Sequence, residues 1–169
     1  MQIVKRNGKK EPFRFDKIQG RLEKQTFNLN ADFIDVHPLA IKIATGCYDG
    51  ITSRELDNLA AETAASMAPK HPDYSILASR IAISALHKES EKYFSDTIEN
   101  LYRYIEPKTG DKAGLISDEV YKIIMENKDQ LNAAVINDRD FNFDYFGFKT
   151  LEKSYLLKIN GKVVERPQH

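Results

Sequence analysis

The chain has 169 residues, of which 41% are hydrophobic and 30% are charged, and its 25 basic and 25 acidic residues cancel to a formal net charge of zero. This composition is typical of a soluble globular protein of one or two small domains, and the zero net charge excludes a global field that would attract nucleic acid or a membrane. The single cysteine, Cys47, excludes an internal disulfide framework and every CxxC zinc or redox motif, and it favours a reducing compartment, the cytoplasm.

The first 24 residues are strongly basic, with eight lysines and arginines against three acidic residues. Short extended segments at residues 3–6 and 11–15 flank Asn7-Gly8, a pair that favours a hairpin turn because both residues accept positive φ. Asp16 is predicted to cap a helix that continues to about Phe27. A short basic stretch of this kind is either a solvated face or an anion-binding site.

Three further helices are predicted in the first half of the chain. One covers about residues 31–48. The next begins at a capping box, in which Thr52 caps the helix and Glu55 reaches back to it, and it ends at Pro69. The last covers about residues 73–91, and apolar residues over most of its circumference predict a central place in a bundle.

The second half continues without a clear linker. A helix at about residues 94–105 is followed by a loop with proline and glycine, and Ser117 is predicted to cap another helix. Next comes an aromatic cluster, which comprises Phe141, Phe143, Tyr145, Phe146 and Phe148. A second hairpin is predicted around Asn160-Gly161. The sequence therefore predicts a mainly α fold: a small β-hairpin or three-stranded lid on a four-helix bundle at residues 1–91, then further helices and a C-terminal β-hairpin at residues 92–169.

Most familiar site motifs are absent. The chain has neither GxxxxGK[ST] nor GxGxxG, so a P-loop or dinucleotide fold has no support. A run from Asp138 resembles a calcium loop, but Phe143 stands where glycine is needed and Lys149 where a bidentate glutamate is needed, so caps and turn residues are predicted instead. The histidines are scattered, no metal site is predicted, and nothing indicates independent catalysis. No apolar run reaches the roughly 18 residues of a membrane span, and no secretory signal is predicted.

The basic N-terminal segment is the best candidate binding site. A helix N-terminus offers free amides and a partial positive charge that attract phosphate, and the helix predicted at Asp16 follows a hairpin that carries Lys5 and Arg6. Ser53 and Asp57 lie four residues apart and so share one helical face. A carboxylate among so many cations indicates a hydroxyl or metal contact rather than a phosphate contact. The residues alone leave both a nucleotide site and a solvated basic face open.

Several motifs resemble those of one known family. The segments of the first half are Val4-Lys5-Arg6-Asn7-Gly8, Glu11-Pro-Phe-Arg-Phe-Asp-Lys17-Ile18, Gly50-Ile-Thr-Ser53, Glu55-Leu-Asp57, Pro72-Asp-Tyr, Ala78-Ser-Arg80 and His87-Lys88-Glu89. They resemble the ATP-cone, the allosteric activity domain of ribonucleotide reductase large subunits. Those of the second half are Asp138-Arg-Asp-Phe, Tyr145-Phe-Gly-Phe-Lys-Thr-Leu-Glu, Ser154-Tyr-Leu-Leu-Lys-Ile-Asn-Gly161 and Glu165-Arg-Pro-Gln-His169. They resemble the aerobic class I large subunit of the eukaryotic-like kind, so the resemblance covers essentially the whole chain.

The resemblance implies a set of nucleotide-binding residues. They are Lys5, Arg6, Glu11, Pro12, Phe13, Arg14, Phe15, Asp16, Lys17, Ser53, Asp57 and Lys88. The family pattern implies that the lysines and Arg6 neutralise the triphosphate of ATP or dATP, with Mg²⁺, and that residues 11–15 face the adenine. It implies that Ser53 and Asp57 engage the ribose or phosphate-linked groups. Two positions depart from the family: Asn7 stands where Asp is usual, and Ser53 stands where Thr is usual but keeps the hydroxyl.

The resemblance also implies a regulatory role. In the family, ATP at this site permits activity, whereas dATP drives an inactive homo-oligomer. The implied partners are the remainder of the large subunit and its radical-bearing small subunit, with no nucleic-acid or membrane partner. Family members continue into a ten-stranded α/β barrel that holds the catalytic cysteines. With Cys47 alone, the chain is expected to be an N-terminal fragment of a cytoplasmic oxidoreductase of deoxyribonucleotide biosynthesis, inactive by itself.

Two alternatives use the same cone. Bacterial repressors of reductase genes carry it in nucleic-acid-binding regulators, but they place a four-cysteine zinc ribbon before it, and this chain has one cysteine. The second alternative is a degenerate interaction module that has lost nucleotide binding, against which the retained charged residues argue. Calorimetric titration with ATP and dATP separates such a module from a functional nucleotide site.

Overall fold

The computed structural model describes residues 1–169. The chain forms two compact units, of which the first comprises Met1–Ala85 with Phe143–Phe148 and the second comprises Leu86–Asn142 with Lys149–His169. Most of the regular structure is helical, with two small sheets, and this confirms the predicted fold class. The domain boundary predicted between residues 91 and 92 stays a prediction.

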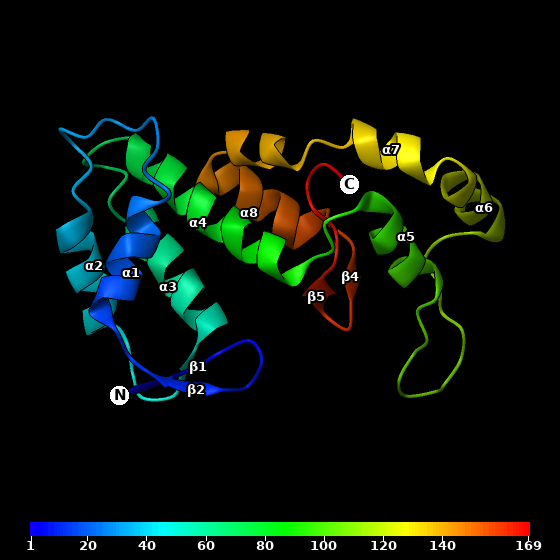
Figure 1. Cartoon of the computed structure of the whole chain (residues 1–169), viewed down its shortest axis with the longest axis horizontal. Coiled ribbons are helices and arrows are strands. Elements are labelled where there is room, and N and C mark those ends of the chain that lie inside the picture. The colour runs from blue at the N-terminus through cyan, green and yellow to red at the C-terminus, as the bar shows by residue number, and fades with distance from the viewer. The chain divides into compact units, whose positions relative to one another are not determined.

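The first unit contains three short strands and helices α1 to α3, together with most of α4 (Figure 1). The bounds are β1 Gln2–Val4, β2 Lys10–Pro12, α1 Phe15–Glu23, α2 Val36–Thr45, β3 Ile51–Thr52, α3 Ser53–Ala65 and α4 Asp73–Glu89. The central strand of the sheet is β1, which pairs antiparallel with β2 and parallel with β3. Ile3 lies opposite Glu11 on one side and Ile51 on the other. This sheet is the predicted three-stranded lid.

The turn between β1 and β2 differs from the predicted geometry. Gly8 alone has a positive φ, of 79°, and its N–H donates to the carbonyl oxygen of Lys5 at 2.9 Å. Asn7 stays outside the left-handed region, and its Oδ1 accepts from the N–H of Lys9 at 3.1 Å. The connection is therefore a three-residue loop that ends in one left-handed residue. Arg6 is the first residue of that loop.

Helix α1 starts and ends earlier than predicted. Arg14 occupies the N-cap position, and no side chain caps the helix. Asp16, the predicted cap, lies inside the first turn and pairs with Arg14 instead. Ile18 and Leu22, which are 6% and 1% exposed, form the buried stripe of the helix. Because these two residues lie four apart, one face of α1 is fixed against the interior.

Helix α2 is shorter than the predicted span of residues 31–48, since it begins only at Val36. Its N-cap is Asp35, whose Oδ1 accepts from the N–H of His37 at 3.0 Å. Pro38 explains the late start. Proline lacks an N–H and clashes with the preceding turn in a helix interior, but it is tolerated in the first turn. A helix that began at Ala31 would have placed Pro38 in its interior.

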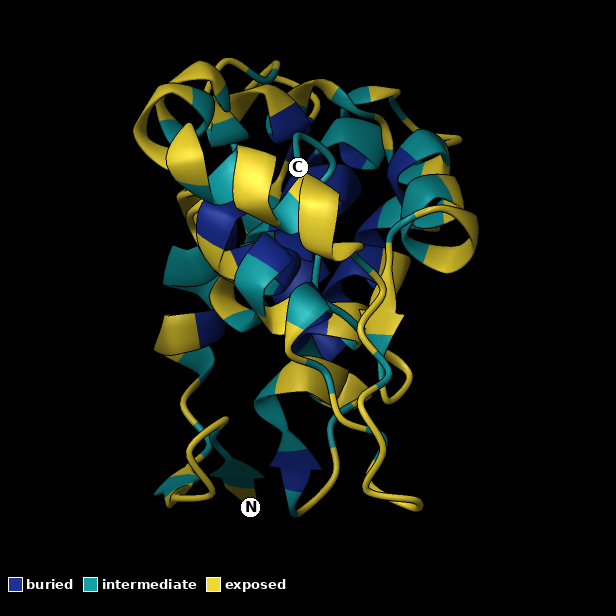
Figure 2. Ribbon diagram, turned by 90° about the vertical axis from the view of Figure 1, so that its right-hand side faces the viewer, coloured by how far each residue is buried: buried dark blue, intermediate teal, exposed yellow.

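Helices α3 and α4 confirm two predictions. Thr52 Oγ1 accepts from the N–H of Glu55 at 3.2 Å, and Glu55 Oε2 accepts from the N–H of Thr52 at 2.8 Å, which is the predicted capping box. In α4, residues 77–83 are all buried, so the helix is surrounded on every side as its sequence predicted. Figure 2 shows the same contrast between buried positions on helices and exposed connecting loops.

The second unit is built from shorter elements. They are α5 Phe94–Tyr102, α6 Asp118–Glu126, α7 Lys128–Ala134, a 3₁₀ helix at Asn137–Asn142, most of α8 Tyr145–Ser154, and strands β4 Lys158–Ile159 and β5 Lys162–Val163. Ser117 Oγ accepts from the N–H of Val120 at 3.3 Å, which confirms the predicted cap of α6. Helices α7 and α8 were not predicted. The run proposed as caps and turns folds as the 3₁₀ helix, and part of the aromatic cluster lies in α8.

The C-terminal hairpin has the predicted turn. Asn160 and Gly161 both have positive φ, of 51° and 75°, as a two-residue loop requires. After β5, the buried guanidinium of Arg166 donates to Ser90 Oγ at 3.0 Å and to the carbonyl oxygen of His87 at 3.0 Å. These bonds fix the last residues to the end of α4 and to the residue that follows it. Every helix of the structure is too short or too polar to cross a bilayer.

Candidate functional site

Two carboxylates in the first unit each hold two basic side chains. The first is Glu11 on β2, whose Oε2 lies 3.4 Å from Lys5 Nζ and 3.3 Å from Lys17 Nζ. Lys5 follows β1 directly, and Lys17 lies in the first turn of α1. All three side chains remain substantially exposed. The contacts with both lysines hold the pKa of Glu11 below its usual range, with the hydrogen bond from Lys17 as the largest cause.

The second carboxylate is Asp57 on α3, which is only 3% exposed. Its Oδ2 accepts from Arg6 Nη2 at 2.7 Å, and its Oδ1 lies 2.7 Å from Arg21 Nη1. The side chains of Arg6 and Arg21 are each 29% exposed. Burial lowers the pKa of Arg21 and the neighbouring Arg6 adds to the effect, while Asp57 opposes it. Both oxygens of this buried carboxylate are therefore engaged by different arginines.

The two clusters repeat one arrangement, and we refer to the six residues together as the charge ladder: Lys5, Arg6, Glu11, Lys17, Arg21 and Asp57. In each cluster, one cation comes from the β1–β2 hairpin and one from α1. Lys17 and Arg21 lie four residues apart, so they are neighbours on one face of α1. Figure 1 shows β1 and β2 at the same end of the unit as the starts of α1 and α3. Four cations and two carboxylates leave this surface with a charge of +2.

The N-terminus of α1 lies beside this ladder in the sequence. The N-cap residue is Arg14, and its side chain makes no capping hydrogen bond to the first-turn amides. Arg14 pairs with Asp16 through Nη2 to Oδ2 at 2.6 Å and Nε to Oδ1 at 3.1 Å, and both side chains are exposed. Uncapped N–H groups at a helix start are donors that suit an anion. Asp16 therefore belongs to the helix start as predicted, but as the partner of Arg14 rather than as a cap.

The remaining residues of the implied set in this unit lie at the end of β2 and at the starts of α1 and α3. Pro12 ends β2, and the N–H of Phe13 donates to the carbonyl oxygen of Met1 at 3.0 Å. Phe15 is the first residue of α1, and its ring meets His37 edge-on at 5.8 Å. The Oγ of Ser53 donates to the carbonyl oxygen of Val4 at 3.4 Å, which joins the start of α3 to β1.

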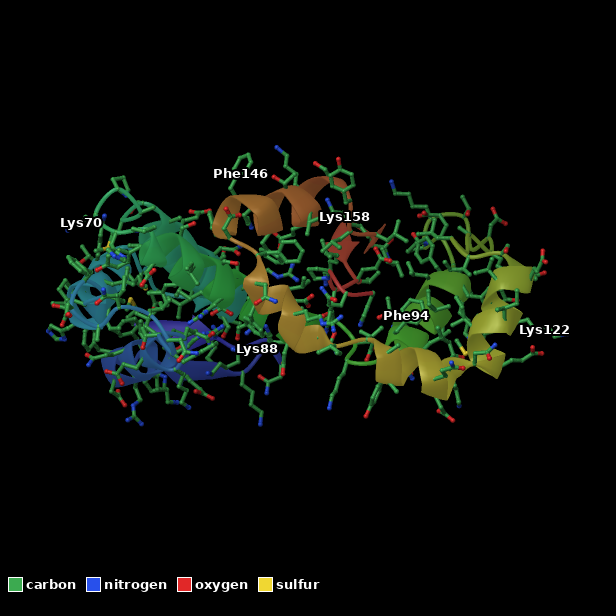
Figure 3. The ribbon with its side chains drawn as sticks, turned by 90° about the horizontal axis from the view of Figure 1, so that it is seen from above. Lys70, Lys88, Phe94, Lys122, Phe146 and Lys158 are labelled. Carbon is green, nitrogen blue, oxygen red and sulfur yellow. The ribbon has the colours of Figure 1, made fainter.

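Lys88 is the one residue of the set that the structure assigns to the second unit. It lies in the last turn of α4, where Figure 3 labels it. The other eleven residues fall in the first unit. The role of Lys88 at the nucleotide therefore stays a prediction from the family resemblance.

Arg21 completes the ladder but was missing from the predicted set. The available signal was its position four residues after Lys17, which puts both on one face of the predicted helix. Its partner Asp57 lies 36 positions further along the chain, on α3, and no local pattern indicates that pairing. The structure places no group of three His, Cys, Asp or Glu side chains where they could hold a metal ion.

Similarity to known proteins covers both units. Residues 1–89 match the ATP cone domain family. The whole chain is 54% identical to the ribonucleoside-diphosphate reductase large subunit of Danio rerio, over 21% of that protein. It is 56% identical to the ribonucleoside-diphosphate reductase large chain 2 of Saccharomyces cerevisiae, over 19% of that protein, and 54% identical to the large subunit of Monkeypox virus, over 22%. The chain thus spans about a fifth of the length of these relatives.

Proposed function

Because this chain belongs to the ATP cone domain family, we propose that its first unit binds ATP or dATP as an allosteric effector of a ribonucleoside-diphosphate reductase. The chain spans about a fifth of the related large subunits, so the reductase chemistry is proposed for the longer protein. In that protein this region senses the nucleotide, and the remainder, with a radical-bearing small subunit, carries out the reduction.

The charge ladder is the observation that carries this proposal. Its four cations come from the hairpin and α1, and Glu11 and Asp57 each hold two of them, so each pair is already assembled before any ligand arrives. Phosphate oxygens accept charge-assisted hydrogen bonds from lysine and arginine as carboxylates do. A triphosphate therefore competes with the two carboxylates for the same donors. The surplus charge of +2 favours the anionic ligand.

The N-terminus of α1 adds further donors for a phosphate. The N-cap side chain of Arg14 makes no capping hydrogen bond, and the positive end of the helix dipole favours an anion. We propose that Lys17 contacts the same phosphate from within this turn. We propose that Mg²⁺ binds together with the triphosphate, whose phosphate oxygens supply ligands for it.

Discrimination between the two nucleotides requires a contact that senses the ribose. ATP and dATP differ by one hydroxyl group, and a ligand shifts a conformational equilibrium only through unequal interaction with the two states. Ser53 and Asp57 carry the polar groups at the start of α3 that suit a sugar hydroxyl. We propose that dATP, by lacking one such contact, favours a different arrangement of α3 and the hairpin and so an inactive homo-oligomer.

Calorimetric titration of the full 169-residue chain tests the proposal. We expect saturable binding of both MgATP and MgdATP, much weaker binding of adenosine, and affinities that fall as salt is raised, because screening weakens contacts between exposed charges. Absence of binding by either triphosphate at low salt would contradict a nucleotide site and favour a degenerate interaction module. Equal binding of adenosine and ATP would show that the charge ladder does not bind phosphate.

A further inference from the structure

The two arginines that bind Asp57 are held in different ways. Arg21 lies within α1, whose inner face is fixed by Ile18 and Leu22, and its Nη2 is buried without a hydrogen-bond partner. Arg6 lies in the three-residue loop of the β1–β2 hairpin, where the surrounding residues are exposed. One partner of Asp57 is thus set in a packed helix, and the other is on a loop at the surface.

We infer that Arg21 is a positioning residue of the nucleotide site, which holds Asp57 in place so that Arg6 can leave it for a phosphate. This inference rests on the proposed function, since it assigns a role at the same site. Arg21 itself keeps its contact with Asp57 when the nucleotide binds. The residue that changes partner is Arg6.

Burial of Asp57 is the physical reason for two arginines. A carboxylate that is 3% exposed and loses its last cation is left as an uncompensated buried charge, which is strongly unfavourable. If Arg6 were its only partner, Asp57 would retain Arg6 and compete effectively with a phosphate. With Arg21 on the other oxygen at 2.7 Å, Asp57 remains paired after Arg6 departs. Arg21 therefore lowers the cost of releasing Arg6.

Release of Arg6 also changes a link between two elements. The pair between Arg6 and Asp57 joins the hairpin to α3 across 51 positions of sequence. Ser53 joins the same helix to β1 through the carbonyl of Val4. When Arg6 moves to a phosphate, the hairpin is joined to the ligand in place of Asp57, so the position of α3 relative to the hairpin becomes dependent on the nucleotide.

The test is a cycle of variants titrated with MgATP. Arg21→Ala leaves Arg6 as the one arginine on Asp57, and we expect it to weaken ATP binding about tenfold. Adding Asp57→Asn removes the charge with which Asp57 holds Arg6, so the double variant is expected to bind MgATP more tightly than Arg21→Ala and about as tightly as Asp57→Asn alone. In the Asp57→Asn background, Arg21→Ala should change the affinity by less than about twofold, because Arg21 acts only through Asp57.

A matched double variant separates this local effect from a change in overall charge. Arg21→Ala with Glu23→Gln restores the same net charge, but Glu23 lies near the end of α1 and is paired with Gln19. We expect no recovery from it. Equal recovery by both double variants would show a field effect and overturn the inference. A tenfold loss on Arg21→Ala in the Asp57→Asn background would also overturn it, since Arg21 would then contact the phosphate directly.

Two controls keep the outcome interpretable. Thermal unfolding establishes that each variant is folded. If Arg21→Ala alone does not fold, the comparison of Asp57→Asn with Asp57→Asn/Arg21→Ala still decides the question, because neither leaves a buried carboxylate without a cation. Failure of the wild type to bind ATP would contradict the proposed function. Normal binding by the wild type and by Arg21→Ala would overturn only the role of Arg21.

Discussion

Each unit of the molecule contains a buried aspartate paired with a distant basic residue, and the two pairs are built differently. Asp57 in the first unit has an arginine on each oxygen, and both arginines are partly exposed. Asp140 in the second unit is fully buried, and its Oδ2 lies 2.7 Å from Nε2 of His87, while its Oδ1 has no partner. One carboxylate thus has two arginine partners that solvent reaches, and the other has a single, mostly buried histidine partner.

The difference indicates which of the two aspartates can release a basic partner to a ligand. Arginine stays protonated at every physiological pH, so the partners of Asp57 remain available to any competing anion. The His87 side chain is 17% exposed and Asp140 is fully buried, so a ligand reaches this pair less readily and the pair suits a structural role. We therefore expect Asp57 to affect nucleotide binding and Asp140 to affect stability.

The largest effect is expected from Asp140→Ala. The change leaves His87 without its buried acceptor and opens a cavity, so we expect a loss of about 3 kcal/mol in the free energy of unfolding. Urea unfolding measures it. Asp138→Ala, an exposed neighbour in the same 3₁₀ helix, is the matched control and should change stability by less than about 0.5 kcal/mol. A loss of ATP affinity in a folded Asp140→Ala variant would contradict the proposal that Asp140 affects stability and Asp57 affects nucleotide binding.

Lys17→Ala removes one cation of the charge ladder in the first unit. We expect the affinities for ATP and dATP to fall together by about 1.5–3 kcal/mol, because a charge-assisted contact with a phosphate common to both is lost. Lys24→Ala removes the same charge at the C-terminal end of the same helix and should leave both affinities nearly unchanged. Unaltered binding by Lys17→Ala would place the triphosphate elsewhere.

Asp57→Asn keeps the size of the side chain and removes its charge. The phosphate then no longer competes with a carboxylate at position 57 for Arg6, so the affinity for triphosphate should not fall through the loss of this charge. The ratio of ATP to dATP affinity should change by about 1–3 kcal/mol if Asp57 senses the sugar. Paired titrations, with size measurement in each nucleotide, check this, ideally in a full-length large subunit. An identical ratio and identical assembly would leave Asp57 as a residue that only stabilises the start of α3.

The smallest effect is a pH dependence confined to the second unit. Burial lowers the pKa of His169, and the charge of Arg166 adds to this. The unfolded chain therefore binds a proton more readily, so stability is lost as the pH falls below about 6.5, by at most about 1.4 kcal/mol per pH unit. Urea unfolding of His169→Gln should show a flatter pH profile than the wild type.

Local signals in the sequence predicted the parts of the fold that depend on neighbouring residues. The capping box at Thr52, the cap at Ser117 and the turn at Asn160-Gly161 each depend on residues a few positions apart, and all three are confirmed. Helix α8 was missed because its aromatic residues show no clear stripe. Its start is fixed by Asp144, whose Oδ1 accepts from the N–H of Gly147 at 2.7 Å.

Ion pairs between residues far apart in the sequence are the part of the site that could not be predicted. Lys5, Arg6 and Lys17 were predicted because they are basic and close in sequence, and Ser53 and Asp57 because they share one helical face. The resemblance to a known family added Lys88. That Asp57 binds Arg6 and Arg21 depends on how α1, α3 and the hairpin pack. The pair of His87 with Asp140 likewise joins residues 53 positions apart. Neither pairing leaves a pattern in the local sequence.

The most direct test of the charge ladder as a phosphate site is an NMR titration of the 169-residue chain with MgATP. We expect saturable shifts of the side-chain signals of Arg6 and Lys17, as these groups exchange carboxylate for phosphate, while the guanidinium signal of Arg21 and the amide of Asp140 change little. Saturable ATP binding that leaves Arg6 and Lys17 unshifted would contradict the proposed site. Shifts of Asp140 as large as those of the ladder would contradict the separation of the two buried carboxylates.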